Sequence, residues 1–329
     1  MRKLFSIVGI GAVLLLVVLI LTKPQICINS VISGLILCGR VIIPALYPFT
    51  FCVLFILKSG LLQKLKIPES VCIFLLSLVG GYPLGAKMLN DSKIAPKTAT
   101  IMLNFCVNAG PAFIILTVGS GVFSSTKIGV LLYLSHLLPS VIMALTFRKK
   151  LKFKSEIKSH NELNIIDNFV LSASDSASTL INICSFVILF SVVCEYIKLC
   201  PVLSPIIPFL EVSNGIATSR NIYLLSFLLG FGGICIWLQV FSLSKRYKPN
   251  YFGFILCRLF HGGLSCGITF LLLKIFNIQI STLSNGKIFT YSTFSQNIGV
   301  GISLTITSII LIISLCNKNF AGNVLEDMV

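Results

Sequence analysis

A glycine-proline element interrupts one of the apolar runs of this chain. It reads Gly-Gly-Tyr-Pro-Leu-Gly-Ala-Lys over residues 80–87, inside a run from about residue 71 to residue 90. A second double glycine, Gly232-Gly233, interrupts another run in the second half of the chain. In a bilayer, a helix that breaks must find new partners for its freed N–H and C=O groups. Helices broken at matched positions in two halves are typical of a transporter's solute site, so these breaks are the first candidate site.

The composition places these runs in a membrane. Hydrophobic residues make up 56% of the chain and charged residues only 11%, against roughly 25% charged residues in a soluble domain. The mean hydropathy is +0.98. The net charge of +16 suggests nucleic-acid binding as an alternative. However, the basic residues lie mostly in short connectors, as the positive-inside rule expects. We therefore expect the lipid bilayer, and no nucleic acid, as a partner.

The apolar runs predict an all-α, multi-pass membrane protein with about eight or nine hydrophobic helical segments, some broken or re-entrant, in two repeat-like halves. Residues 1–147 form the first membrane half, residues 148–168 a basic cytoplasmic connector, and residues 169–329 the second half. The expected segments cover residues 4–21, 28–57, 71–90, 98–122, 128–147, 172–197, 222–243, 251–275 and 298–316. This pattern predicts a cell-membrane location.

The basic residues also predict a topology. Arg2 and Lys3 indicate a cytoplasmic N-terminus, and the basic run at residues 148–158 marks the connector as cytoplasmic. If every segment between them crossed the membrane, these two sites would lie on opposite sides. We therefore expect residues 71–90 to form a re-entrant hairpin. A plain kinked helix with an outward N-terminus is the alternative.

An internal repeat is weakly indicated. An offset of 152 residues sets residues of the first half on residues of the second: Gly80 on Gly232, Gly81 on Gly233, Gly110 on Gly262 and Lys87 on Gln239. Because glycine is common in membrane helices, these matches alone carry little weight. An inverted repeat would make residues 222–243 a second hairpin with residues 245–248 outside. The positive-inside rule favours a full crossing, with those residues inside.

Polar side chains within the apolar segments are further candidates, because burying an unpaired polar group in lipid is costly. They are Asn104, Asn108, Gly110 and Pro111 in one segment, Glu211 and Asn214 after a proline-rich patch, Arg258 and His261 in a later segment, and Arg40 in mid-span. For each asparagine, a hydrogen bond that joins two helices is an equal alternative to solute contact. For Lys87 the alternative is an ion pair with Asp91 at i+4.

The sequence favours transport over enzymatic catalysis. Residues 119–121 read Gly-Ser-Gly, but they lie at a span end, where an interfacial turn is the simpler interpretation of this serine. The chain contains neither an H-E-x-x-H motif nor a P-loop. Its twelve cysteines include no C-x-x-C pair and lie mostly in apolar runs. We therefore expect no metal and no cofactor. His136, near a span end, and His160, in the connector, receive no role.

Several elements carry a family resemblance when taken together. Residues 80–87 resemble a G-Y-P-x-G-A-K signature, and residues 104–114 an N-F-C-x-x-x-G-P-x-F-I stretch. Residues 44–49 are similar to P-x-L-x-P-F, and residues 211–216 to E-x-[TS]-x-G-I. Residues 230–240 resemble a second glycine motif, with Trp237 where a histidine is usual. These motifs, in this order, resemble those of the YlbJ family of sporulation integral membrane proteins, in the nucleoside-recognition or Gate domain group.

The resemblance implies hairpins and broken helices arranged as repeats, as in concentrative nucleoside transporters. It also implies a role in spore development, where the family has been linked to moving dipicolinate into the developing spore. We expect a carrier of a small anionic solute, and dipicolinate in particular, because cationic groups outnumber buried acids and helix N-termini attract anions. A nucleoside transporter and a non-transporting scaffold are the alternatives. A forespore membrane location and a homo-oligomer are left open.

The predicted solute-binding residues are Gly80, Gly81, Tyr82, Pro83, Gly85, Lys87, Asn104, Asn108, Gly110, Pro111, Glu211, Asn214, Gly232, Gly233, Gln239, Arg258 and His261, with Arg40 as a further candidate.

Overall fold

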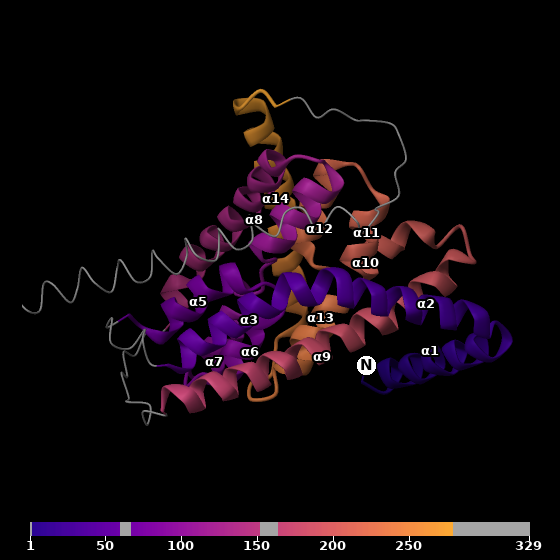
Figure 1. Ribbon diagram of the computed structural model, residues 1–329, viewed down its shortest axis with the longest axis horizontal. Helices are drawn as coiled ribbons and strands as arrows, with labels where there is room; N and C mark the ends of the chain where they lie inside the picture. The colour runs from indigo at the N-terminus through magenta and orange to yellow at the C-terminus, as the bar shows by residue number, and fades with distance from the viewer. Residues whose placement is uncertain (1, 60–66, 152–163, 279–329) are drawn as a thin grey trace, which may run out of the picture.

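The computed structural model describes residues 2–59, 67–151 and 164–278, and its regular elements there are all helices (Figure 1). The chain begins with α1 (Arg2–Thr22) and α2 (Pro24–Leu37). A π-helical turn (Cys38–Ile42) joins α2 to α3 (Ile43–Lys58). Proline starts α2 at a position where its missing N–H costs no hydrogen bond. The predicted segment at residues 298–316 and most of the predicted connector lie outside the described residues.

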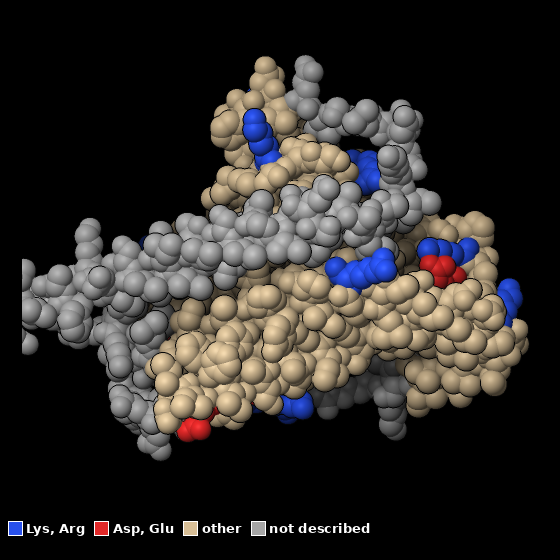
Figure 2. Space-filling model, in the orientation of Figure 1, with Lys and Arg blue, Asp and Glu red and all other residues tan. Residues whose placement is uncertain are grey.

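Five helical segments of the described chain are long and apolar enough to cross a membrane: Pro24–Lys58, Thr126–Lys150, Ile165–Lys198, Ile222–Leu243 and Tyr251–Ile275. Large apolar side chains on them are exposed, among them Leu35, Ile181 and Phe270. On the face shown in Figure 2, uncharged residues cover most of the described surface, and the charged residues form a few small, separate patches. Lipid is the solvent that suits such a surface. The prediction of an all-helical, multi-pass membrane protein is confirmed.

The long helices on one side of the fold are antiparallel. At one end, the Tyr196 hydroxyl of α9 (Ile165–Lys198) donates to the Lys23 carbonyl at 3.0 Å. At the other end, Lys58 forms an ion pair with Asp175 of α9. The start of the α2–α3 helix therefore lies beside the end of α9, and its end lies near the start of α9.

The segment around the first glycine-proline break folds back on itself. It consists of α5 (Glu69–Gly80), a tip at residues 81–83, and α6 (Leu84–Asp91). The backbone N–H of Lys93 donates to the Glu69 carboxylate at 3.3 Å, which brings the two ends of the segment together. We call residues 69–93 the first return.

The next segment, predicted as one helix over residues 98–122, is interrupted. It has α7 (Pro96–Met102), a largely unwound stretch at residues 103–111, and a π-helix (Ala112–Val122). The break lies where Gly110-Pro111 predicts an open backbone. α8 (Thr126–Phe147) follows. We call residues 96–122 the interrupted crossing.

After α9, residues 201–219 also fold back, and we call them the second return. They contain a short 3₁₀ turn (Ser204–Ile206), α10 (Ile207–Leu210) and α11 (Val212–Thr218). A Cβ added to Gly215 would lie only 2.8 Å from the Cβ of Pro208, so α10 and α11 pack tightly against each other. The prolines and Glu211, which end the helices here, explain why no long helix forms.

The last described segments are α12 (Ile222–Phe231), α13 (Gly233–Leu243) and α14 (Tyr251–Ile275). Arg220, just before α12, donates to the Val122 carbonyl at 3.3 Å. Arg246, just after α13, donates to the Ile94 carbonyl at 2.6 Å. Residues 222–243 therefore run from the far end of the interrupted crossing to the base of the first return. Of the two alternatives for this segment, the fold favours the crossing over the hairpin.

Candidate functional site

A cavity of about 50 Å³ lies where the two returns meet. Four residues of the predicted set line it: Tyr82 and Gly110 from the first half, Glu211 and Gln239 from the second. Ser213 adds a hydroxyl, and the rest of the wall is apolar. At ~15 Å³ per water, the cavity has room for roughly three water molecules. A few polar groups converge here on a mostly apolar wall, as in many ligand sites.

The tip of the first return touches the interrupted crossing through backbone contacts. Gly81 has φ 78°, a conformation that strains residues with a side chain. A Cβ on Gly81 would lie 3.3 Å from the backbone nitrogen of Gly110, and one on Gly85 only 1.6 Å from the carbonyl oxygen of Cys106. These glycines allow two backbones to meet and so shape the cavity wall.

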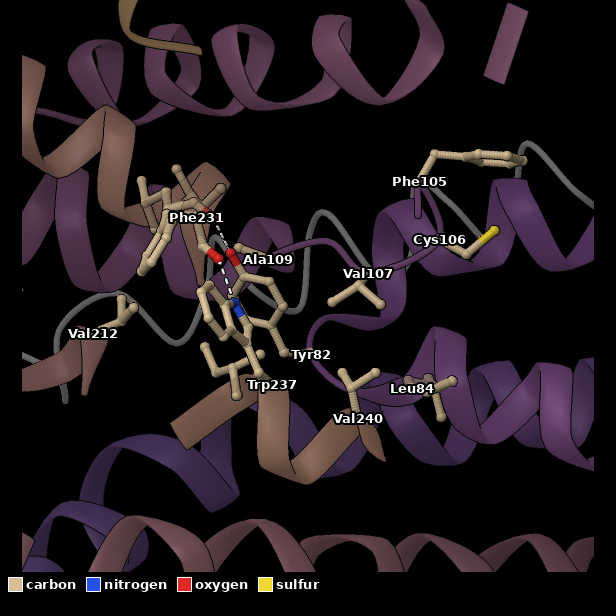
Figure 3. Close-up of a cluster of buried hydrophobic side chains, with 14 of the residues drawn as sticks. Tyr82, Leu84, Phe105, Cys106, Val107, Ala109, Val212, Phe231, Trp237 and Val240 are labelled. Atoms are coloured by element: carbon tan, nitrogen blue, oxygen red, sulfur yellow. Dashed lines mark hydrogen bonds between the residues drawn. The ribbon is translucent and has the colours of Figure 1, made fainter. Parts of the chain in front are cut away.

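Side chains satisfy the backbone groups that the break after α12 frees. Gly232 and Gly233 have φ 84° and 72°. The Tyr82 hydroxyl donates to the Leu229 carbonyl, and the Trp237 indole N–H donates to the Phe231 carbonyl at 2.9 Å (Figure 3). These bonds are what a helix broken inside a bilayer requires. Trp237 acts here as a donor to the broken helix.

Glu211 is buried and caps α11. Its two carboxylate oxygens accept the backbone N–H groups of Ser213 and Asn214 at 3.0 and 2.7 Å. The ion pairs of the described chain, which join Lys58 to Asp175, Lys87 to Asp91 and Lys198 to Glu195, leave Glu211 out. Glu211 is therefore an acid on the cavity wall without a basic partner among the described residues.

Arg258 is fully buried and does not line the cavity. Its guanidinium donates to the Val107 carbonyl, to the Asn104 carbonyl at 3.2 Å, and to Nδ1 of His261 at 2.7 Å. Both carbonyls belong to the unwound stretch at residues 103–111. Arg258 thus does for the unwound stretch at residues 103–111 what Tyr82 and Trp237 do for the break after α12. The prediction that it faces a solute finds no support in this geometry.

A histidine pair extends the Arg258 network to α8. With Nδ1 accepting from Arg258, the Nε2–H of His261 donates to the His136 carbonyl at 3.0 Å. Nε2 of His136 accepts the backbone N–H of Ala109 at 2.9 Å. The two rings lie 4.7 Å apart between centroids. Sequence reasoning placed His136 near a span end and gave it no role. A histidine in an apolar helix was itself the missed signal.

Other predicted residues lie away from the cavity. Lys87 pairs with Asp91 at 2.9 Å, the alternative stated for it above. Asn108 is fully buried, donates to the Phe105 carbonyl at 3.0 Å and accepts from the Ser140 hydroxyl, so it joins helices. Arg40 is exposed. Ser213, absent from the predicted set, lines the cavity; its place two residues after Glu211, in the same motif, was the available signal.

The remaining predicted residues lie close in the sequence to residues that line the cavity. The cavity wall as defined above does not include Gly80, Pro83, Pro111, Asn214, Gly232 or Gly233. They belong to the tips and breaks that carry the lining residues. Their direct contact with a solute stays a prediction.

Comparison with known proteins gives a distant relative. The chain is similar to the sporulation integral membrane protein YlbJ of Bacillus subtilis (strain 168), with 23% identity over an alignment 330 positions long, which covers 79% of this chain and 81% of the relative. No family model and no solved structure matches the chain. The similarity confirms, as a distant homology, the resemblance to the YlbJ family that the motifs indicate. With the five apolar helices, it places the protein in the membrane.

Proposed function

We propose that this protein is a sporulation-associated membrane transporter, with no enzymatic activity, whose solute passes through the cavity between the two returns. The main support is the composition of the cavity wall. Tyr82 and Gly110 come from the first half of the chain, and Glu211 and Gln239 from the second. In secondary transporters, solute sites lie between two repeats and are formed by discontinuous helices.

The order of the elements supports an inverted repeat. The offset that aligns its two halves differs from the 152 residues suggested by the glycines. Each half has a long helix, a return, an interrupted segment and a second long helix. In the first half these are α2–α3, residues 69–93, residues 96–122 and α8. In the second they are α9, residues 201–219, residues 222–243 and α14. The first long helices are antiparallel, as inverted repeats require. In this scheme both returns are re-entrant hairpins that enter from opposite sides of the membrane.

The charges around the cavity favour the nucleoside alternative over dipicolinate. Among the described residues that line the wall, Glu211 is the one that carries a charge. Lys87 is paired with Asp91, and Arg258 is bonded to backbone carbonyls. A dicarboxylate would meet a like charge at Glu211, and no basic side chain of the described residues lines the wall to offset it. A carboxylate and an amide instead suit a solute with hydroxyl and amide groups. A nucleoside needs a wider cavity than about 50 Å³, which the alternating states of a transporter would supply.

The role in sporulation and a forespore membrane location rest on the distant relative, whose name describes a sporulation membrane protein. A scaffold role requires no solute, and the wild-type chain then binds neither class. The test is a binding screen with the purified full-length protein, which compares uridine with dipicolinate. Saturable uridine binding supports the proposal. Saturable dipicolinate binding with no response to uridine overturns the solute assignment and restores the anion hypothesis.

A further inference from the structure

We propose that one end of the fold, formed by the base of the first return and the turn after α13, binds the headgroup of an anionic phospholipid. Four exposed lysines carry the charge, and we call them the basal patch: Lys93, Lys97, Lys245 and Lys248. The lipid phosphate lies at the basal patch and the acyl chains lie along the start of α14. This inference does not depend on the transported solute, and it is tested without one.

Two segments far apart in the sequence build the basal patch, and hydrogen bonds hold them together. The turn that follows α13 lies beside α6 and α7 (Figure 1). The Arg246 guanidinium in this turn donates to the Ile94 carbonyl at 2.6 Å. The Thr100 hydroxyl donates to the Lys248 carbonyl at 3.3 Å. The two pairs of lysines therefore stand on neighbouring backbones, so their ammonium groups act on one ligand.

The lysines of the basal patch have no acidic partner among the described residues. The ion pairs there include none of the four. Two acids of the same end are engaged otherwise: Asp91 pairs with Lys87 at 2.9 Å, and Glu69 accepts the backbone N–H of Lys93 at 3.3 Å. A cluster of four lysines next to membrane-spanning helices attracts the negative headgroups of the adjacent leaflet.

The basal patch lies at the depth of the lipid headgroups. Residues 244–250 join two segments that are long and apolar enough to cross a membrane, Ile222–Leu243 and Tyr251–Ile275. A short connector between two crossings lies at the boundary between hydrocarbon and water. Tyr251, which follows the connector directly, is exposed. Exposed tyrosine is typical of this boundary, where its ring meets hydrocarbon and its hydroxyl meets water.

The start of α14 supplies a surface for acyl chains. Phe252, Leu256 and Phe260 are 72%, 49% and 57% exposed. Their spacing of four residues places them along one face of the helix. This apolar stripe begins just after Lys248 in the sequence and continues along α14, a membrane-spanning helix. A soluble anion would contact the lysines alone, whereas a phospholipid contacts the lysines with its phosphate and the stripe with its chains. The stripe therefore favours a lipid as the occupant.

The experiment measures lipid binding to the purified full-length protein by native mass spectrometry in a neutral detergent. Dioleoyl-phosphatidylglycerol is compared with dioleoyl-phosphatidylcholine, which has the same chains and no net charge. Glycerol 1-phosphate is the soluble anion. We expect phosphatidylglycerol to bind on the order of tenfold more tightly than phosphatidylcholine, and less tightly as the salt concentration rises. Glycerol 1-phosphate should not bind at the same concentrations.

Two double variants and a matched control locate the site. Lys93→Gln/Lys97→Gln removes one pair of lysines and Lys245→Gln/Lys248→Gln removes the other. Each is expected to lose about tenfold in affinity for phosphatidylglycerol, with unchanged binding of phosphatidylcholine. Because these side chains are exposed, both variants should unfold at the wild-type temperature in detergent alone.

The control is Lys127→Gln/Lys274→Gln. It removes two exposed lysines from the other end of the fold, at the start of α8 and the end of α14. Its change in net charge equals that of each double variant, and it is expected to bind phosphatidylglycerol as the wild type does.

Four results overturn the proposal. The first is equal affinity of the wild type for the two phospholipids, and the second is wild-type affinity in both double variants. The third is an equal loss of affinity in the control, which would make the attraction a property of the overall charge. The fourth is binding of glycerol 1-phosphate as tight as that of phosphatidylglycerol, which would assign the basal patch to a soluble anion. Because no transported solute is present, none of these results bears on the proposed function.

Discussion

Gly85 offers a sharp test of the contact between the first return and the interrupted crossing. A Cβ added at this position would lie 1.6 Å from the Cys106 carbonyl oxygen. Heavy atoms in good contact sit about 3.5 Å apart, so Gly85→Ala forces the two backbones to separate by about 2 Å. Overpacking of this kind costs about 3 kcal/mol, at the upper end of its usual range. The better helix propensity of alanine returns about 1 kcal/mol, which leaves a net loss of about 2 kcal/mol.

The matched control is Gly263→Ala. Gly263 also lies in a helix, but a Cβ there would meet nothing within 4 Å. We expect Gly263→Ala to unfold at or slightly above the wild-type temperature. Gly85→Ala should unfold about 5 °C lower, at a few degrees per kcal/mol. The assay is thermal unfolding of the purified variants in detergent. Equal unfolding temperatures for the two variants would show that the return does not pack against residues 103–111.

Three further predictions follow from the described contacts. Arg258→Lys is expected to lose about 1–3 kcal/mol of stability with unchanged solute affinity, because one ammonium group cannot donate to two carbonyls and His261 at once. A wild-type unfolding temperature together with lost affinity for dipicolinate would restore the role of Arg258 in anion binding. Asn108→Ala should also cost about 1–3 kcal/mol of stability and so lower the unfolding temperature, because it leaves the Ser140 hydroxyl without its partner. A wild-type unfolding temperature would contradict the helix-joining role. In a cysteine-free background, Lys93→Cys and Lys248→Cys should react with an impermeant thiol reagent from one side of the membrane. Lys127→Cys should react from the other side. Labelling of Lys93→Cys and Lys248→Cys from opposite sides would contradict the crossing at residues 222–243.

The sequence predicts the helical framework well, because length and apolarity decide what crosses a membrane. The segment expected at residues 251–275 matches α14 (Tyr251–Ile275). Both glycine breaks lie where the glycines predict them, since a positive φ or a close backbone contact needs a residue without a Cβ. The sequence does not predict how the chain continues after each break. Gly81 lies at the tip of a return and Gly232 within a segment that runs the length of the fold, a difference that single glycines do not encode.

The candidate site was predicted in part. Tyr82, Gly110, Glu211 and Gln239 were singled out, and the structure brings them to one cavity. Arg258 shows why the sequence could not predict the rest of the site. Its sequence context indicates a costly buried cation, but a guanidinium that donates to backbone carbonyls and one that binds a carboxylate solute leave the same pattern. Only the position of residues 103–111 beside α14 distinguishes the two.

The central claim is that a solute with hydroxyl and amide groups passes Glu211. Its most direct test is uptake of labelled uridine, with labelled dipicolinate as the comparison, into vesicles that contain the wild type, Glu211→Gln or the control Glu195→Gln. The account predicts saturable uridine uptake by the wild type and by Glu195→Gln, its loss in Glu211→Gln, and no dipicolinate uptake. Accumulation of dipicolinate that Glu211→Gln leaves unchanged, or uptake of neither solute, would contradict it.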